Sequence, residues 1–288
     1  MFHVSFPGLG ITDLPINRTA FSIGSFSVYW YGILIAISLL LAVTYAYFNA
    51  WRYDVDRDKL LDCVIVGIIT SIIGARAYYV AFKWDYFSSN PIEVFDIRDG
   101  GIAIYGAIIG ALIGGLTVAK IKRMKLLPVL DITMTCFFIG QAIGRWGNFF
   151  NQEAFGTETD SLFRMISENT IIDGQKAAVH PCFLYESVWC ALGFLLLFIV
   201  NRKFQKYHGQ VFYLYLVWYG FERMIVEGLR TDSLYLPLQL FGMDVRVSQA
   251  LSAVLMIAGV ILLFINRNKK NEMRRRKYTK KTPAEKRG

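Results

Sequence analysis

The chain has 288 residues, of which 55% are hydrophobic and only 18% carry a charge. A soluble domain of this size has too few charged residues to cover its surface when so many of its residues are hydrophobic. The apolar residues come in runs of about 20, the length that crosses a bilayer as a helix. The composition therefore excludes an ordinary soluble fold and predicts a multi-pass membrane protein.

The apolar runs predict seven membrane-spanning helices in an all-α fold. In chain order they cover residues 28–50, 60–82, 102–119, 128–145, 182–200, 211–228 and 247–266. Together they form one transmembrane domain over residues 1–266, with a small extracytoplasmic segment at 146–181 and a basic tail at 267–288. No cleavable signal peptide is expected, because no basic region followed by an apolar core stands at the front.

The basic residues indicate the orientation of these spans. Twenty-one Lys and Arg lie in the tail and in the segments around Arg52, Lys122 and Arg202, against seven in the alternate segments. The positive-inside rule then places the C-terminus in the cytoplasm and the N-terminus outside. The net charge of +9 comes largely from the tail, which is expected to touch anionic lipid headgroups rather than nucleic acid.

Small and sulfur-containing residues give two minor expectations. The four cysteines are scattered without metal-ligand spacing, so no metal site or other cofactor is expected. Gly106, Gly110 and Gly114 lie on one face of a helix and predict close packing against a neighbouring helix.

Arg145 is the most informative charge in the predicted spans, since charged side chains at membrane depth are costly and usually face a polar interior. If its helix continues, Asn148, Asn151 and Gln152 stack above it; the neighbouring glycines instead favour a break. In either case the arginine, these amides and Glu153 converge at the outer end of the fourth span. A guanidinium fork suits a phosphate. The alternative is a purely structural polar plug.

The sixth span carries a second cluster. Tyr219, Arg223, Glu227 and Arg230 follow one another at helical spacing and form a continuous polar stripe. Glu227 is placed to pair with both arginines, which would leave positive charge for an anionic ligand. The alternative is a ladder of ion pairs that holds helices together.

A third group lies at the outer start of the fifth span. Pro181 suits the first turn of a helix, and His180 is expected to support the site, with a simple helix cap or a hydrogen-bonded structural residue as the alternative. Glu186 follows inside the apolar run and requires a partner there, for which an arginine is the natural choice.

Three further residues stand alone in the sequence. Arg76 lies near a helix end, where snorkelling or bonding between helices is the alternative to a functional role. Tyr31 and Tyr105 open the first and third spans on the outer side, where tyrosines commonly belong to the interfacial belt.

Taken together, these residues resemble the bacterial prolipoprotein diacylglyceryl transferase family. The most specific match runs from Gly144 through Arg145 to Glu153 and ends at Gly156. Supporting matches are Phe21-Ser22-Ile23-Gly24, Tyr29-Trp30-Tyr31-Gly32, Gly74-Ala75-Arg76, Asp99-Gly100-Gly101, His180-Pro181, Tyr185-Glu186, Tyr219-Gly220, Arg223 and Glu227.

The resemblance implies a transferase that moves the diacylglyceryl group of phosphatidylglycerol to the lipobox cysteine of a preprolipoprotein, the first step of lipoprotein maturation. A thioether forms and glycerol phosphate leaves. The transmembrane domain would be catalytic, in the bacterial cell membrane, with its site on the extracytoplasmic side. Arg145 would bind the lipid headgroup, and the residues needed for activity or supporting it would be Tyr31, Asn148, Gly156, Glu186, Tyr219, Arg223 and Glu227.

One departure concerns the base for the thiol. Many family members have His-Gly-Gly at the start of the third span, where this chain has Tyr105-Gly106-Ala107. A histidine base at this position therefore does not apply, and a tyrosine with an unperturbed pKa near 10 would need neighbouring arginines to act as one.

The residues and the resemblance agree on a reaction in which a thiolate attacks the glyceryl carbon that bears the phosphate ester. Arg145 and Arg223 would stabilise both the thiolate and the charge that grows on the phosphate, with Asn148 also on the lipid. Two other classes remain open: a channel or transporter for an anionic solute, which would also want intramembrane arginines, and a scaffold without catalysis. Inverted repeats would favour transport, and no convincing repeat is found.

Overall fold

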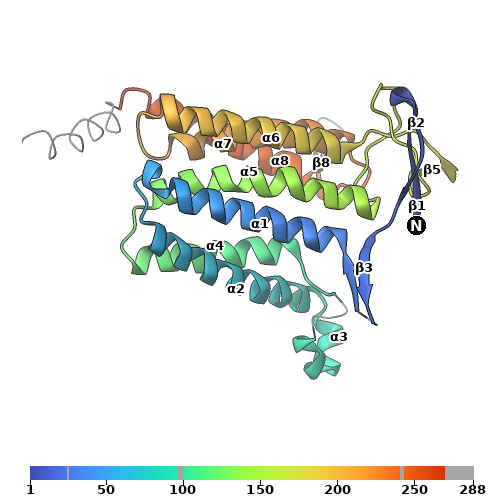
Figure 1. Cartoon of the computed structure of the whole chain (residues 1–288), viewed down its shortest axis with the longest axis horizontal. Coiled ribbons are helices and arrows are strands. Elements are labelled where there is room, and N and C mark those ends of the chain that lie inside the picture. Colours follow the sequence, from blue (N-terminus) through green and yellow to red (C-terminus); the bar gives the residue numbers. More distant parts are fainter. Residues whose placement is uncertain (25, 97–99, 241–242, 270–288) are drawn as a thin grey trace, which may run out of the picture. The chain divides into compact units, whose positions relative to one another are not determined.

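The computed structural model describes residues 1–24, 26–96, 100–240 and 243–269. Within them, the long helices are α1 (Trp30–Asn49), α2 (Arg57–Phe82), α4 (Ile104–Ile121), α5 (Leu126–Asn151), α6 (Cys182–Ile199), α7 (Gln210–Leu229) and α8 (Val247–Ile265) (Figure 1). Shorter helical segments are η1 (Pro7–Leu9), η2 (Ala50–Tyr53), α3 (Trp84–Ser89), η3 (Pro91–Phe95) and η4 (Val200–Phe204). Most of the predicted tail, residues 270–288, lies outside the described part of the chain.

Six of the described helices are long and apolar enough to cross a membrane, namely α1, α2, α4, α5, α6 and α8. This confirms a helical, multi-pass membrane protein, and each of the six corresponds to a predicted span. The exception is α7, which has 20 residues but carries Glu222, Arg223 and Glu227. A seventh crossing and the orientation stay predictions.

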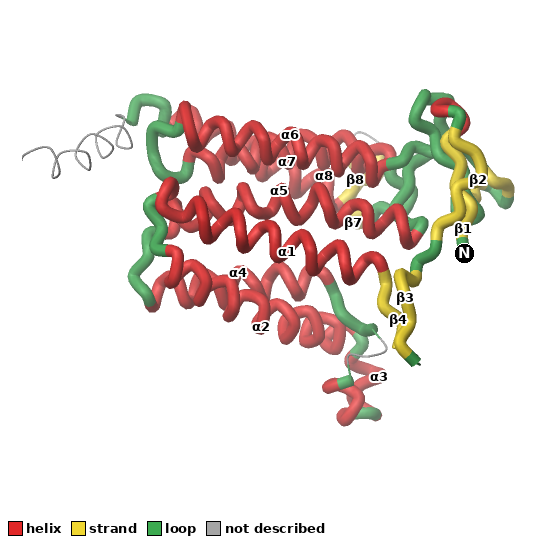
Figure 2. Tube along the Cα trace, viewed as in Figure 1, coloured by secondary structure: helices red, strands yellow, loops and turns green. Residues whose placement is uncertain are grey.

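The strands were not predicted. They form four antiparallel hairpins, coloured yellow in Figure 2: β1 (Phe2–Phe6) with β2 (Ile11–Ile16), β3 (Thr19–Ile23) with β4 (Phe26–Tyr29), β5 (Ile171–Ile172) with β6 (Gln175–Lys176), and β7 (Tyr235–Leu240) with β8 (Met243–Arg246). All of them lie in segments between or before the helices. The end of β4 replaces the first two residues of the predicted span 28–50, and the other strands lie where no span was predicted.

The chain forms two compact units, one built from Met1–Ala42 with Thr133 onwards and one from Val43–Ile132. In the second unit, α2 and α4 approach so closely that a Cβ added to Gly106 would lie 2.2 Å from the carbonyl oxygen of Gly74. A Cβ on Gly110 would lie 2.1 Å from that of Thr70. The close packing predicted for the glycine face is therefore confirmed.

The first unit has a hydrophobic core at the ends of α5 and α6. Its buried members are Val4, Phe6, Ile16, Phe149, Met165, Ala177, Val179 and Phe183, contributed by the β1–β2 hairpin, the two helices and the segment between them. Burial of these side chains anchors the last turn of α5 beside the first turn of α6. The candidate site lies just inside these two turns.

Helix α5 is longer than expected, because it continues from the predicted end at 145 to Asn151. It stops at Gln152, which has a left-handed φ of 52° and whose side-chain amide donates to the carbonyl of Phe149 (2.6 Å). The alternative in which the chain breaks at the glycines is therefore wrong. The segment predicted to be extracytoplasmic, which we call the outer segment, begins at 152. A single helix thus carries Arg145 and the amides that follow it.

Candidate active site

Helices α5 and α6 are locked together at the level of Arg145. The indole Nε1 of Trp146 donates to Ser187 Oγ (3.1 Å), and that hydroxyl donates to the carbonyl of Ala142 (2.7 Å). The rings of Phe149 and Phe183 pack with centroids 4.9 Å apart. Each helix therefore has one fixed rotation and depth against the other, which aims Arg145 at α6.

Helices α6 and α7 are joined by a reciprocal tryptophan pair. Trp189 Nε1 donates to the carbonyl of Trp218 (3.1 Å), and Trp218 Nε1 donates to the carbonyl of Trp189 (3.0 Å). Their rings stack with centroids 4.6 Å apart. The stacked indoles bury large surfaces while both N–H groups stay bonded, so this contact fixes α7 one turn from its charged residues.

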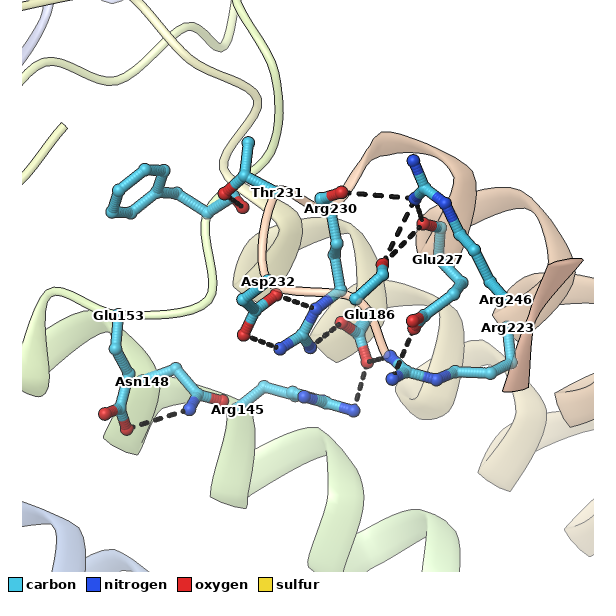
Figure 3. Close-up of polar contacts among 12 residues, drawn as sticks. Arg145, Asn148, Glu153, Glu186, Arg223, Glu227, Arg230, Thr231, Asp232 and Arg246 are labelled. Carbon is cyan, nitrogen blue, oxygen red and sulfur yellow. Dashed lines mark hydrogen bonds and ion pairs between the residues drawn. The ribbon is translucent and has the colours of Figure 1, made fainter. Parts of the chain in front are cut away.

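Glu186 on α6 is the centre of the site. Its side chain is 2% exposed and forms an ion pair with Arg145 of α5. It also lies 3.5 Å from Nη1 of Arg223 and 3.6 Å from Nη1 of Arg230. Figure 3 shows the three guanidinium groups turned toward this carboxylate. The arginine partner predicted for Glu186 is confirmed, and it has three of them.

Two further carboxylates, Glu227 and Asp232, pair with Arg223 and Arg230. Arg223 Nη2 lies 2.6 Å from Glu227 Oε2, as the helical spacing predicted. Arg230, however, pairs with Asp232, to which its Nε and Nη2 donate at 2.8 and 2.7 Å. Three carboxylates thus face three arginines. The positive charge expected to remain unpaired on α7 is therefore balanced among these six residues.

The Arg230–Asp232 pair is visible in the electrostatics of both groups. The hydrogen bond and charge of Arg230 lower the pKa of Asp232 against a smaller opposing effect of burial. Burial by itself would lower the pKa of Arg230, but its hydrogen bond and ion pair with Asp232 outweigh this and raise that pKa. Both groups are therefore held in their charged forms.

Arg145 is the least committed of the three arginines. Its side chain is 21% exposed, against 15% for Arg223 and 12% for Arg230. Within the described residues its ion pair is with Glu186 alone, a carboxylate that it shares. A guanidinium has five N–H donors, so Arg145 keeps donors for a ligand.

Asn148 and Asn151 do not stack freely above Arg145. Both side-chain amides donate to Oε1 of Glu153, at 3.1 and 3.0 Å. Asn148 lies about one turn beyond Arg145 on the same helix (Figure 3). Gln152 is buried at the end of the helix and is not part of this arrangement.

Two of the tyrosines predicted for the site, Tyr31 and Tyr219, belong to the first unit. The ring of Tyr31 lies against Gly147, because a Cβ there would be 2.1 Å from Tyr31 Cδ2. Tyr219 interacts electrostatically with Arg223 and Arg145. Tyr219 therefore belongs to the arginine cluster. The described contact of Tyr31 is with α5 at Gly147, and its role in the site stays a prediction.

Substituting Gly147 by alanine is expected to reduce activity about tenfold or more while the protein stays folded, because the new methyl displaces the ring of Tyr31, a residue predicted to be needed for activity. Gly140→Ala is the matched control two turns earlier in α5, where a Cβ meets nothing within 4 Å. It should keep activity and stabilise the helix by about 0.5–1 kcal/mol. Turnover and melting temperature of both purified variants check this, and equal activities would show that Tyr31 does not need its present position.

Gly156 and His180 bring the outer segment to the ends of α6 and α7. Gly156 N donates to the carbonyl of His180 (2.9 Å), and the next residue, Thr157, donates to that of Leu229 (2.8 Å). A Cβ on Gly156 would lie 2.8 Å from His180 Cβ, so no larger residue fits without displacement.

The side chain of His180 does not cap α6, and it is instead a hydrogen-bonded residue, the other alternative that the sequence left open. Pro181 occupies the N-cap position, and no side chain bonds to the helix end. The His180 ring instead pairs with the hydroxyl of Tyr185 (3.2 Å), and burial lowers the pKa of the imidazole.

Sequence reasoning missed Arg246, which it counted only as a loop charge. This guanidinium donates to the carbonyls of Glu227 and Arg230 and to Ser233 Oγ, and so closes the C-terminal end of α7. It also missed Asp232, although a carboxylate two residues after an arginine is a visible signal. Both residues fix the position of Arg230.

Arg76 and Tyr105 belong to the second unit. Arg76 donates to the carbonyls of Val94 and Gly101, each at 2.8 Å, and therefore secures the segment before α4. Tyr105 stands in the first turn of α4 and is half-exposed. A role for either in the reaction stays a prediction, and Asp99 lies outside the described residues.

The fold and this cluster define a class: a multi-pass membrane protein with a buried set of arginines and carboxylates among its helices. The profile of the prolipoprotein diacylglyceryl transferase family matches residues 18–265. The phosphatidylglycerol–prolipoprotein diacylglyceryl transferase of Finegoldia magna is 46% identical over 86% of this chain and 94% of its own length. Those of Clostridium novyi and Listeria innocua are each 42% identical over 89% of this chain and 98% and 92% of their own lengths. The chain belongs to the prolipoprotein diacylglyceryl transferase family.

Proposed function

We propose that this chain transfers the diacylglyceryl group of phosphatidylglycerol to the thiol of a prolipoprotein lipobox cysteine. The chain is similar to proteins that are named for this activity, and the similarity covers almost their whole length. The observation that carries the proposal is Arg145, a partly exposed guanidinium with uncommitted donors beside a buried ion-pair cluster. A phosphodiester is the anion for which such a fork is suited.

In this proposal Arg145 and Asn148 bind the lipid phosphate. Glu186 orients the guanidinium groups of Arg223 and Arg230 toward that phosphate. The lipobox thiol gives up its proton and the thiolate attacks the glyceryl carbon that bears the phosphate ester. The carbon–oxygen bond breaks, a thioether forms, and glycerol phosphate departs with the bonding electrons. The arginines stabilise the negative charge on both the incoming sulfur and the leaving phosphate. Because their side chains are already held in position, they need to rearrange little during the reaction.

The site is proposed to open on the extracytoplasmic side. With α7 counted as a seventh crossing, the basic segments alternate with the less basic ones and the C-terminus is cytoplasmic. The segment 152–181 then lies outside, directly after α5. Arg145 precedes the last residue of α5 by less than two turns, so it sits about 9 Å inside the helix end. Lipid and signal peptide would both reach that depth from the outer leaflet.

The test uses purified protein in nanodiscs with a fluorescent lipobox peptide. With phosphatidylglycerol we expect a diacylglyceryl mass increment on the peptide and an equal amount of glycerol phosphate; phosphatidylethanolamine discs and a Cys→Ser peptide serve as controls. The proposal is wrong if phosphatidylglycerol yields no increment from folded protein. Flux of an anionic solute through proteoliposomes under those conditions would instead indicate transport.

A further inference from the structure

Glu222 on α7 is a buried carboxyl group that the proposed reaction has not used. The residue is 3% exposed, and both of its side-chain oxygens are buried without a hydrogen-bond partner in the described structure. The carboxylates of Glu186, Glu227 and Asp232, by contrast, are each paired with an arginine. A buried polar group left unbonded is costly and is retained where it serves the chemistry.

The surroundings of Glu222 are those of the site. Its charge interacts with Arg145 on α5, Glu186 on α6, and Arg223 and Arg230 on and after α7. Cys190 of α6 and Tyr215 and Tyr219 of α7 complete the titratable groups that feel it. The carboxyl therefore lies within the same electrostatic cluster that would hold the phosphate, one residue before Arg223.

The transfer needs a group that accepts the proton of the cysteine thiol, since the thiolate is the nucleophile. A carboxylate already paired with an arginine is poorly suited, because protonation would break a buried ion pair. At the start of α4, in the second unit, the chain has Tyr105 and not a histidine. Glu222 has both oxygens available and meets the requirement.

We infer that Glu222 is the proton acceptor for the lipobox thiol, an inference that rests on the proposed function. The S–H bond breaks and its proton moves to one Glu222 oxygen. The sulfur electron pair forms the bond to the glyceryl carbon, whose C–O bond to phosphate breaks. Glycerol phosphate then takes the proton from Glu222 directly or through water, which restores the carboxylate.

The step also fits the movement that the lipid must cause. A phosphate that binds Arg145 draws this side chain from Glu186, which remains neutralised by Arg223 and Arg230. Arg145 is the guanidinium nearest to solvent, so its displacement would open the path along which the thiol reaches Glu222. Until then the carboxyl stays closed to water, which would otherwise compete as a proton donor.

Glu222→Gln tests the inference, because it keeps the shape of the side chain and removes its basicity. With a cysteine lipobox peptide we expect kcat to fall about 10²- to 10⁴-fold, with KM for phosphatidylglycerol within about twofold of wild type. With a selenocysteine peptide, whose selenol is largely ionised at neutral pH, the loss should shrink to less than about tenfold. Glu158→Gln, an exposed glutamate of the outer segment, is the control and should leave both rates unchanged.

Two outcomes overturn the inference: full cysteine turnover by Glu222→Gln, or equal losses with both peptides, which would indicate a structural role. If Glu222→Gln does not fold, Glu222→Asp replaces it, and the same cysteine-selective loss is expected from the displaced carboxylate. Wild-type protein is assayed in parallel. Failure of wild type to modify either peptide would count against the proposed function, whereas a wild type that transfers normally leaves Glu222 alone under test.

Discussion

Replacing Glu186 by glutamine is expected to destabilise the protein by about 3–5 kcal/mol and to abolish transfer, the largest combined effect of any single change at this site. The carboxylate is 2% exposed and faces Arg145, Arg223 and Arg230. Glutamine keeps the volume but not the charge. Three guanidinium groups would then repel one another in a buried site. Arg145 would also lose Glu186, its ion-pair partner among the described residues.

The measurement is thermal unfolding of the purified variant in detergent together with transfer to a lipobox peptide. Glu158→Gln removes an exposed carboxylate from the outer segment and should change neither quantity, because an exposed charge contributes little. If Glu186→Gln melts with wild type and remains active, Glu186 does not organise the arginines. Loss of activity without loss of stability would limit its role to orienting Arg145.

The membrane-spanning helices could be predicted because runs of apolar residues report directly on the bilayer. The end of α5 could not, since Gly144 and Gly147 read locally as a helix break. In the folded protein Gly147 instead provides space for the ring of Tyr31, a residue more than a hundred positions away. Propensity is a weak prior, and a tertiary contact overrides it here.

The composition of the site was foreseeable, but its pairing was only partly so. Helical spacing gave the contact between Arg223 and Glu227, because neighbours one turn apart meet on any helix. The convergence on Glu186 depends on how α5, α6 and α7 are rotated. The Trp146–Ser187 bond fixes α5 against α6, and the Trp189–Trp218 pair fixes α6 against α7. No spacing within one segment carries that information.

The four hairpins escaped prediction for a related reason. The strands are short, and β5 and β6 have two residues each, too few for an alternating pattern to emerge. They are stabilised by contacts such as the backbone bonds between Ser5 and Ile166, which join segments far apart in the sequence.

Arg145→Ala is expected to lower kcat/KM by about 10³-fold or more while leaving stability almost unchanged, the reverse of the balance at Glu186. The difference follows from the pairing. Removing Arg145 leaves Glu186 neutralised by Arg223 and Arg230, whereas removing Glu186 leaves three cations without their shared anion. Arg145→Lys should recover only part of the activity, because an ammonium group keeps the charge but cannot grip a phosphate with two parallel bonds.

Release of glycerol phosphate at varied phosphatidylglycerol concentration separates binding from chemistry in these variants. If the guanidinium only holds the lipid in its ground state, KM rises and kcat stays; if it also stabilises the departing phosphate, kcat falls as well. Arg164→Lys is the matched control, since this arginine donates to the carbonyls of Asp160 and Ser161 in the outer segment. Near wild-type turnover by Arg145→Ala would refute the arginine mechanism, because Arg223 and Arg230 are tied to Glu227 and Asp232 and have fewer donors to offer in its place.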